Sequence, residues 1–409
     1  MSRRSASVIR TSLDQSRRVS GRIFLGIAAL AGLLLGVSAL SDLHGLSFVV
    51  RAVGLQGVVR FAAGIDTVRY TERLVRVPLR VDSLEARVYV PLRSRQTVLL
   101  VSGLHTAGID EPRLVAFARE LAKSGVTVVT PSIAELTRFE ITPLLTDRIE
   151  QTALWLAGNS ELSRAGRVGI MGISFSGGPS IVAAGRQTLR NRVLYVFAFG
   201  GHDDLPRVLR YLCTGIEPEL SGGPAPQPEN GLTPSVPHDY GVAVVLLNVA
   251  DHLVPPEQVE PLRDAVRRFL RASHLDRIDT RAAAREFAAL RALAPQLPEP
   301  AAALLRSVND RDVGRLGRLL VPHVASHGDA PALSPSRSPA PTAPVYLLHG
   351  RHDAVIPAVE SEYLARRLRG HVPVRLLVTD LISHAEPDQP AHATDVLRLA
   401  SFWGDVLAR

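Results

Sequence analysis

Short apolar runs alternate with amphipathic stretches in two separate blocks of the chain, residues 97–199 and residues 345–378. Continuous apolar runs separated by helical patterns predict parallel strands that are covered on both faces by helices. The expected strands are 97–102, 125–131, 167–172, 192–199, 345–349 and 374–378, and the expected helices between them are 113–123, 147–157 and 360–368.

The segments around these two blocks follow different patterns. Residues 67–91 alternate between polar and apolar positions, which predicts an antiparallel entry to the sheet. Residues 203–340 consist mostly of helical runs broken by proline-rich joints, and residues 331–344 form a Ser/Pro-rich connection with few core-forming side chains. We therefore expect a mostly parallel α/β domain made of 67–202 and 341–409, with 203–340 inserted as a helical cap.

The amino-terminal region predicts a membrane anchor. Residues 1–22 carry six arginines against one acid, and residues 23–40 then run without a charge. A helix of that length rises about 27 Å, close to the hydrocarbon thickness of a bilayer. The arginines favour a cytoplasmic tail, so that the catalytic domain lies on the extracytoplasmic (periplasmic) side of the cell membrane.

A cleaved signal peptide is the alternative, because small residues at 37–39 resemble a cleavage site; the domain would then be secreted. The amphipathic segment that follows, 41–66, is predicted either to lie on the membrane surface or to pack on the domain.

Composition and charge exclude several other classes. With 46% hydrophobic and 21% charged residues, the balance is that of a globular protein. The net charge of +8 comes from scattered arginines, and Lys123 is the only lysine, so no basic stripe indicates nucleic-acid binding. Cys213 is the only cysteine, which excludes an intrachain disulfide and a multi-cysteine zinc site. We expect no metal and no cofactor.

One short motif carries the strongest chemical signal. Gly172-Ile173-Ser174-Phe175-Ser176 follows an expected strand and precedes a helical pattern. A nucleophile elbow needs small residues two positions before and two after the serine, because the turn brings backbone segments close together. Gly172 and Ser176 meet this need, which makes Ser174 the candidate nucleophile. Ser176 is the competitor, although the register of the strand favours Ser174.

These motifs resemble the α/β-hydrolase superfamily, over roughly residues 70–405, and most closely its dienelactone-hydrolase and prolyl-oligopeptidase-like branches. The fifth motif position departs from the usual glycine. The resemblance implies a triad acid at Asp353, after the strand 345–349, and a triad base at His384, in the loop after the last strand. Asp251 is the alternative acid, since it also follows an apolar run at 242–248 that is expected to be a strand.

The resemblance also implies two N–H donors for an oxyanion. One is Phe175; the other is Leu104, or Ala107 if the loop is aligned two residues further on. Among the remaining histidines, His349 and His352 have a spacing that a metal site can use, but no third ligand accompanies them. We expect three further histidines to be loop or surface residues: His105, His202 and His252.

The sequence therefore predicts a serine hydrolase that cleaves an ester, thioester or amide bond in a small-molecule or peptide acyl substrate. Two alternatives remain: an acyltransferase that uses the same triad, and a non-catalytic α/β-hydrolase-fold protein that binds a partner at the membrane.

Overall fold

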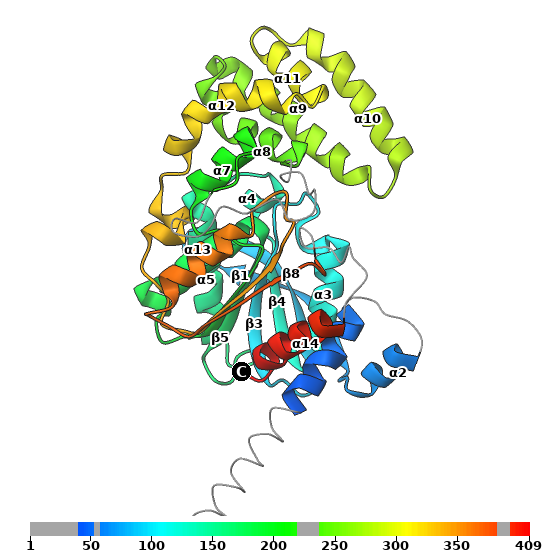
Figure 1. Cartoon of the computed structure of the whole chain (residues 1–409), viewed down its shortest axis with the longest axis vertical. Coiled ribbons are helices and arrows are strands. Elements are labelled where there is room, and N and C mark those ends of the chain that lie inside the picture. The colour runs from blue at the N-terminus through cyan, green and yellow to red at the C-terminus, as the bar shows by residue number, and fades with distance from the viewer. Residues whose placement is uncertain (1–39, 53–57, 219–236, 383–392) are drawn as a thin grey trace, which may run out of the picture.

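A computed structural model describes residues 40–52, 58–218, 237–382 and 393–409 (Figure 1). Its centre is an eight-stranded sheet with the order β1-β2-β4-β3-β5-β6-β7-β8. The pairs β1/β2 and β2/β4 are antiparallel, and all the other pairs are parallel. The strands are β1 Tyr70–Pro78, β2 Ser83–Pro91, β3 Gln96–Val101, β4 Val126–Pro131, β5 Val168–Ile173, β6 Val193–Phe199, β7 Val345–Gly350 and β8 Val374–Thr379.

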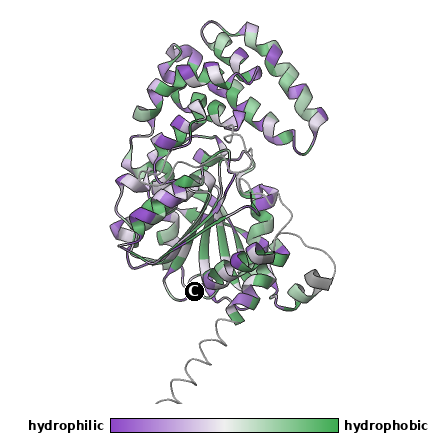
Figure 2. Cartoon of the chain, viewed as in Figure 1, coloured by the Kyte–Doolittle hydropathy of each residue, from purple (hydrophilic) through white to green (hydrophobic). Residues whose placement is uncertain are grey.

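Helices cover both faces of this sheet. One apolar core lies under α3 and α14, and a second lies under α5, α6 and α13. In Figure 2 the central strands are largely hydrophobic, whereas the helices also carry hydrophilic residues. Both faces of the sheet are therefore buried under the apolar sides of helices. The sheet-domain helices are α2 Val58–Ile65, α3 Pro112–Lys123, α4 Ala134–Thr137, α5 Pro143–Gly158, α6 Gly177–Gly185, α13 Val359–Leu368 and α14 Ala393–Leu407.

The block after β6 is a helical cap that stands at one end of the sheet (Figure 1). Its apolar core is continuous with the one under α5 and α6. The cap helices are α7 Leu205–Thr214, α8 Asp239–Val249, α9 Pro256–Leu275, α10 Thr280–Leu293, α11 Ala301–Asn309 and α12 Val313–His327.

One predicted strand is wrong, because residues 242–248 lie in the helix α8. Nearly all of its side chains are buried, since it packs against α7, α9 and α12 at the centre of the cap. A helix buried on all sides has the same continuous apolar pattern as a buried strand, so periodicity does not separate the two. Asp251 therefore follows a helix, and it is half-exposed beside Arg263 in an ion pair of 3.2 Å.

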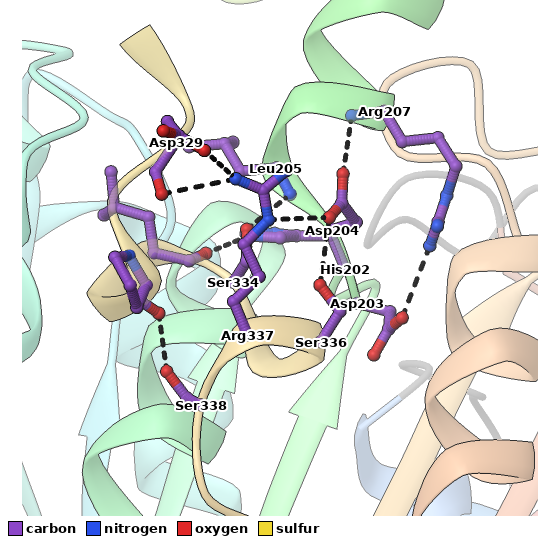
Figure 3. Close-up of polar contacts among 12 residues, drawn as sticks. His202, Asp203, Asp204, Leu205, Arg207, Asp329, Ser334, Ser336, Arg337 and Ser338 are labelled. Atoms are coloured by element: carbon purple, nitrogen blue, oxygen red, sulfur yellow. Dashed lines mark hydrogen bonds and ion pairs between the residues drawn. The ribbon is translucent and has the colours of Figure 1, made fainter. Parts of the chain in front are cut away.

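The Ser/Pro-rich connection is an ordered part of the cap hinge, which we define as residues 200–205 and 329–340. Its two chain segments are joined by hydrogen bonds (Figure 3). Ser334 is fully buried and its hydroxyl accepts from the Leu205 N–H at 2.9 Å. The Ser336 hydroxyl donates to the Asp204 carboxylate at 2.9 Å. The low apolar content of this connection thus reflects polar pairing between its segments.

A second network joins the hinge to the sheet domain. The carboxylate of Glu360, in α13, is fully buried and accepts from the side chain of Arg207 in α7 and from the backbone N–H groups of Asp203 and Asp204. Asp203 also forms an ion pair with Arg367 at 2.8 Å. Since Arg207 belongs to the first cap helix, this network fixes the cap relative to α13.

Residues 40–52 are helical and pack on the sheet domain, at the opposite end of the molecule from the cap (Figure 1). Phe48 lies against Trp403 of α14, with ring centroids 4.6 Å apart. Arg51 is buried and pairs with Glu120 of α3 at 3.0 Å, while it also donates to the Ser124 hydroxyl at 2.6 Å. Of the two arrangements considered for residues 41–66, the helical part up to residue 52 therefore packs on the domain.

In the described part of the chain, no helix is long and apolar enough to span a membrane. The span expected at 23–40 lies outside the described residues, apart from Leu40.

Candidate active site

Ser174 lies at the carboxyl end of β5, in a backbone conformation that few residues other than glycine adopt. Its φ is +56°, and the short 3₁₀ turn Ser174–Ser176 leads from it directly into α6. Positive φ costs about 1–3 kcal/mol for an ordinary residue and is kept where the surrounding structure enforces it. A serine at the tip of such a strand-to-helix turn is the geometry of a nucleophile elbow.

Two glycines show how the surroundings enforce this turn. A Cβ on Gly172 would lie 2.5 Å from both the Ser176 carbonyl oxygen and the Ser180 hydroxyl. A Cβ on Gly103, in the loop after β3, would lie 3.2 Å from the Ser174 Cβ. The serine turn is therefore closely packed at both glycines: a side chain at Gly172 would force it to shift, and one at Gly103 would press against the Ser174 Cβ.

The neighbouring serine has a different environment. The Ser176 hydroxyl is fully buried, accepts from the Ile173 N–H at 2.9 Å and lies within 3.1 Å of the Val101 carbonyl oxygen. These contacts tie the turn to the ends of β5 and β3. Ser176 thus holds the turn in place, with its hydroxyl directed into the protein.

Asp353 lies in the loop after β7 and is 2% exposed. One oxygen of its carboxylate accepts from the backbone N–H groups of Val355 and Ile356, at 2.8 and 2.9 Å. Gly200, at the end of β6, comes close to the other oxygen, because a Cβ there would lie 3.4 Å from it. The backbone thus fixes the orientation of this carboxylate at the same edge of the sheet as the Ser174 turn.

His349 has a role that the sequence did not predict. Its ring is fully buried, Nε2 donates to the Ile356 carbonyl at 2.9 Å, and Nδ1 accepts from the Ser361 hydroxyl at 2.6 Å. Nε2 also lies 3.4 Å from the Asp353 carboxylate, so this nitrogen positions the acid loop, while Nδ1 ties the ring to α13. His352, by contrast, is exposed and lies 3.4 Å from Asp380. Among the described residues, no group of three or more His, Cys, Asp or Glu side chains is arranged to hold a metal.

His202 lies in a loop, as expected, but it is buried, with only 1% of its surface exposed. Its Nε2 donates to the Leu333 carbonyl at 2.9 Å across the cap hinge, and its ring lies 6.2 Å from that of Phe175. Burial lowers the pKa of this imidazole, so it is neutral at physiological pH. Its ring packs near Phe175, the residue after Ser174, and its hydrogen bond to Leu333 joins the serine turn to the hinge.

The loop after β3 carries both candidates for the second oxyanion donor. Gly103 contacts the serine turn, and Leu104 follows it directly. The Ala107 N–H, the alternative donor, is already hydrogen-bonded to Nδ1 of His105 at 3.1 Å. The predicted base, His384, lies outside the described residues.

Comparisons with known proteins were made by sequence and by structure. No family model matches the chain, and no curated protein matches it. A solved dienelactone hydrolase from Anabaena variabilis matches with 17% identity and a TM-score of 0.41, over 82% of this chain and 96% of its own. A hyperthermophilic esterase from Pyrobaculum calidifontis matches with 14% identity and a TM-score of 0.47, over 91% and 93%.

An acylaminoacyl peptidase from Pyrococcus horikoshii matches with 11% identity and a TM-score of 0.40, and this chain spans 40% of its length. The assignment of the fold rests on the molecule itself: the sheet order, the parallel crossovers and the strained serine turn after β5. The chain has an α/β-hydrolase-like fold, with a mostly parallel sheet flanked by helices, as the resemblance of its motifs implied.

Proposed function

We propose that this protein is a serine hydrolase that cleaves an ester, thioester or amide bond through an acyl-enzyme on Ser174. The observation that carries the proposal is the positive φ of Ser174 in a turn that Gly172 and Gly103 keep free of side chains. Strain of this kind is typical of a functional nucleophile, because it holds the side chain at the tip of the turn. The fixed orientation of the Asp353 carboxylate adds further support.

In the proposed mechanism, His384 takes the proton from the Ser174 hydroxyl as its oxygen attacks the carbonyl carbon of the substrate. The π electrons of the carbonyl move to its oxygen and form a tetrahedral oxyanion. When this intermediate collapses, the bond to the leaving group breaks and His384 donates the proton to that group. Asp353 keeps the imidazole in the required tautomer and stabilises its protonated form.

Water then completes the turnover. His384 takes a proton from a water molecule, whose oxygen attacks the acyl carbon. A second oxyanion forms and collapses, the bond to Ser174 breaks, and the serine oxygen regains the proton while the carboxylic acid leaves. An acyltransferase would follow the same steps with an alcohol or amine in place of water.

We assign the two oxyanion donors to Phe175 and Leu104. Phe175 follows the nucleophile and starts the turn into α6, where the helix end favours developing negative charge. Leu104 is favoured over Ala107 because Gly103 contacts the serine turn, whereas the Ala107 N–H is occupied by His105.

For location, we propose that residues 23–40 anchor the protein in the cell membrane, with the catalytic domain outside the cytoplasm. The charge pattern of residues 1–40 supports this arrangement. Protease digestion of intact spheroplasts tests it: cleavage of the catalytic domain is expected, and its full protection would contradict the proposal.

Labelling with a fluorophosphonate probe tests the catalytic proposal directly. We expect the wild type to be labelled and Ser174→Ala and His384→Ala to lose labelling, because the probe reacts only with an activated serine. Ser176→Ala, two residues further on, tests the competing hydroxyl: it should still be labelled, but more slowly than the wild type, because it loses the hydrogen bonds that hold the turn.

Two results would overturn the proposal. A folded wild type that resists the probe would favour the non-catalytic binding protein, and equal labelling of Ser174→Ala would mean that another residue is the nucleophile.

A further inference from the structure

Three rings from separate segments meet at the interface of the cap and the sheet domain. His105 comes from the loop after β3, His274 from the last turn of α9 and Tyr240 from the first turn of α8. The rings of His105 and His274 are stacked, with centroids 4.3 Å apart and planes 19° apart. The Tyr240 ring is tilted against His274, with centroids 6.0 Å apart. We call these three residues the aromatic arch.

The two ends of the arch are close in sequence to residues that contact the serine turn and the acid loop. His105 is two residues after Gly103, whose backbone contacts the Ser174 turn. At the other end, the His238 N–H donates to the Ala354 carbonyl at 3.0 Å, which attaches the start of α8 to the Asp353 loop. The arch therefore extends from the proposed oxyanion loop to the acid loop.

A buried contact holds the arch in place. Phe139 is fully buried and packs against His274, with ring centroids 5.8 Å apart. Asn248 of α8 fixes the backbone around it, since its amide donates to the Phe139 carbonyl at 2.9 Å and accepts from the Ile141 N–H at 2.8 Å. His274 is thus part of a formed structure that links α8, α9 and the loop after α4.

All three rings are uncharged near neutral pH. Burial is the main cause that lowers the pKa of His274 to about 3, and the positive charges of Arg113 and Arg277 act in the same direction. Burial also lowers the pKa of His105 and raises that of the Tyr240 phenol, the latter with help from the charge of Asp353.

Three further features of the arch bear on ligand binding: a paired charge next to it, an unpaired imidazole nitrogen, and the partial exposure of its rings. The Arg113 charge is paired with Glu111 at 2.6 Å. Nδ1 of His274 is buried and has no hydrogen-bond partner in the described part of the chain. A buried polar atom without a partner is costly, and a bound ligand can remove that cost. All three side chains are half-buried, whereas their neighbours Leu104 and Phe139 are buried.

We propose that the aromatic arch is the specificity element of the site and that it binds a planar, uncharged aromatic group of the acyl substrate. Flat neutral rings favour such a group by stacking and by apolar burial. The arch offers it the exposed parts of two imidazoles and one phenol, since all three side chains are half-buried. This inference rests on the proposed function, because it places the aromatic group next to the bond that Ser174 attacks.

The test compares aromatic with alkyl esters, followed by the release of acid. Ethyl phenylacetate against ethyl butyrate examines the acyl side, and phenyl butyrate against ethyl butyrate examines the leaving-group side. In His274→Leu we expect the aromatic-to-alkyl ratio of kcat/KM to fall about tenfold on at least one side, mainly through KM. His274→Phe, which keeps a flat ring, should restore the ratio.

His323→Leu is the matched control. His323 belongs to a different stacked pair in the cap, with His252 at 5.2 Å, and its removal should leave both ratios unchanged. Fluorophosphonate labelling of each variant reports whether Ser174 is still active. A labelled, folded His274→Leu whose two ratios stay within twofold of the wild type would overturn the inference and leave the proposed function intact.

A binding measurement covers the case in which the proposed function itself fails. If the wild type is not labelled, calorimetric titration with acetophenone and with 2-butanone still measures binding to the arch. Neither ketone has a leaving group, so the measurement does not depend on catalysis. We expect acetophenone to bind His274→Leu about tenfold more weakly than the wild type. Equal binding to both proteins, or equal binding of the two ketones to the wild type, would refute the arch.

Discussion

The sheet domain and the cap hold their polar groups in different ways. In the sheet domain, backbone atoms determine where the reactive groups lie: Ser174 is held by its strained turn, and Asp353 by two backbone N–H groups. Where the cap meets the sheet domain, side chains hold side chains, as in the pairing of Arg207 with Glu360 and the stacking of His274 on His105.

Because of this difference, the two regions should respond differently to amino-acid substitutions. A site that backbone atoms position changes only when a substitution forces the backbone itself to move, which most single side-chain substitutions do not do. Contacts between side chains can be altered one at a time. The proposed chemistry and the proposed specificity therefore lie in regions that respond differently to mutation.

The largest expected effect comes from a single methyl group at the serine turn. In Gly172→Ala the new Cβ would lie 2.5 Å from the Ser176 carbonyl and from the Ser180 hydroxyl, so the turn must shift. We expect the rate of fluorophosphonate labelling to fall about 100-fold, because displacements near 1 Å have that cost. Gly158→Ala is the matched control, since a Cβ there meets nothing within 4 Å. Equal labelling rates for both variants would show that the backbone of this turn does not determine the position of the Ser174 hydroxyl.

The next effect concerns the side-chain pairing at the hinge. Arg207→Met leaves the fully buried Glu360 carboxylate without its guanidinium, and we expect the free energy of unfolding to fall by about 3 kcal/mol. Chemical denaturation measures this change. Arg210→Met, an exposed arginine on the same helix, should stay within about 0.5 kcal/mol of the wild type. A similar small change in Arg207→Met would mean that the hinge does not depend on this pair.

A pH dependence of stability tests the neutral state of the arch. The folded pKa of His274 is depressed to about 3, so the unfolded imidazole, with a pKa near 6.5, binds a proton that the folded one does not. Its contribution is therefore complete above pH 6.5 and is lost as the pH falls toward 3, by up to about 2 kcal/mol at pH 5. Denaturation at pH 7.5 and 5.0 should show a smaller loss in His274→Phe than in the wild type. Identical losses would argue against a depressed pKa.

The smallest effect is expected at the contact between α8 and the loop that carries Phe139. Asn248→Ala removes three hydrogen bonds, two of them to the segment around Phe139, and should lower the free energy of unfolding by about 1–2 kcal/mol. Because Phe139 packs behind His274, the aromatic-to-alkyl ratio should fall with it. Gln296→Ala, which removes one exposed side-chain hydrogen bond in the cap, should change neither the free energy of unfolding nor the aromatic-to-alkyl ratio. A stability loss without a change in the ratio would separate this contact from the arch.

Much of the sheet domain could be predicted from the sequence. The antiparallel entry and the parallel strands match the predictions to within one or two residues at most boundaries. The fold resemblance that the Ser174 motif implied is confirmed. The roles of Ser174, Asp353 and His384 remain predictions, and His384 lies outside the described residues.

The cap was predicted less well. Residues 242–248 form a helix where we expected a strand, because a central cap helix is apolar on every side. Residues 331–340 of the Ser/Pro-rich connection belong to the polar hinge, whose hydrogen-bonded Ser334 and Ser336 have no apolar signal. His202 lies in a loop, as expected, but its burial against the serine turn was not predicted.

What the sequence determined by itself is local: the apolar period of the strands, the small residues around Ser174, and the order in which serine, acid and histidine follow one another. These depend on neighbours along the chain, so their signals lie within short windows. Only the tertiary structure decided that His105, Tyr240 and His274 meet, and that His349 joins the acid loop to α13. The physical reason is that such contacts join segments far apart in the sequence, and their geometry arises only when the cap packs on the sheet.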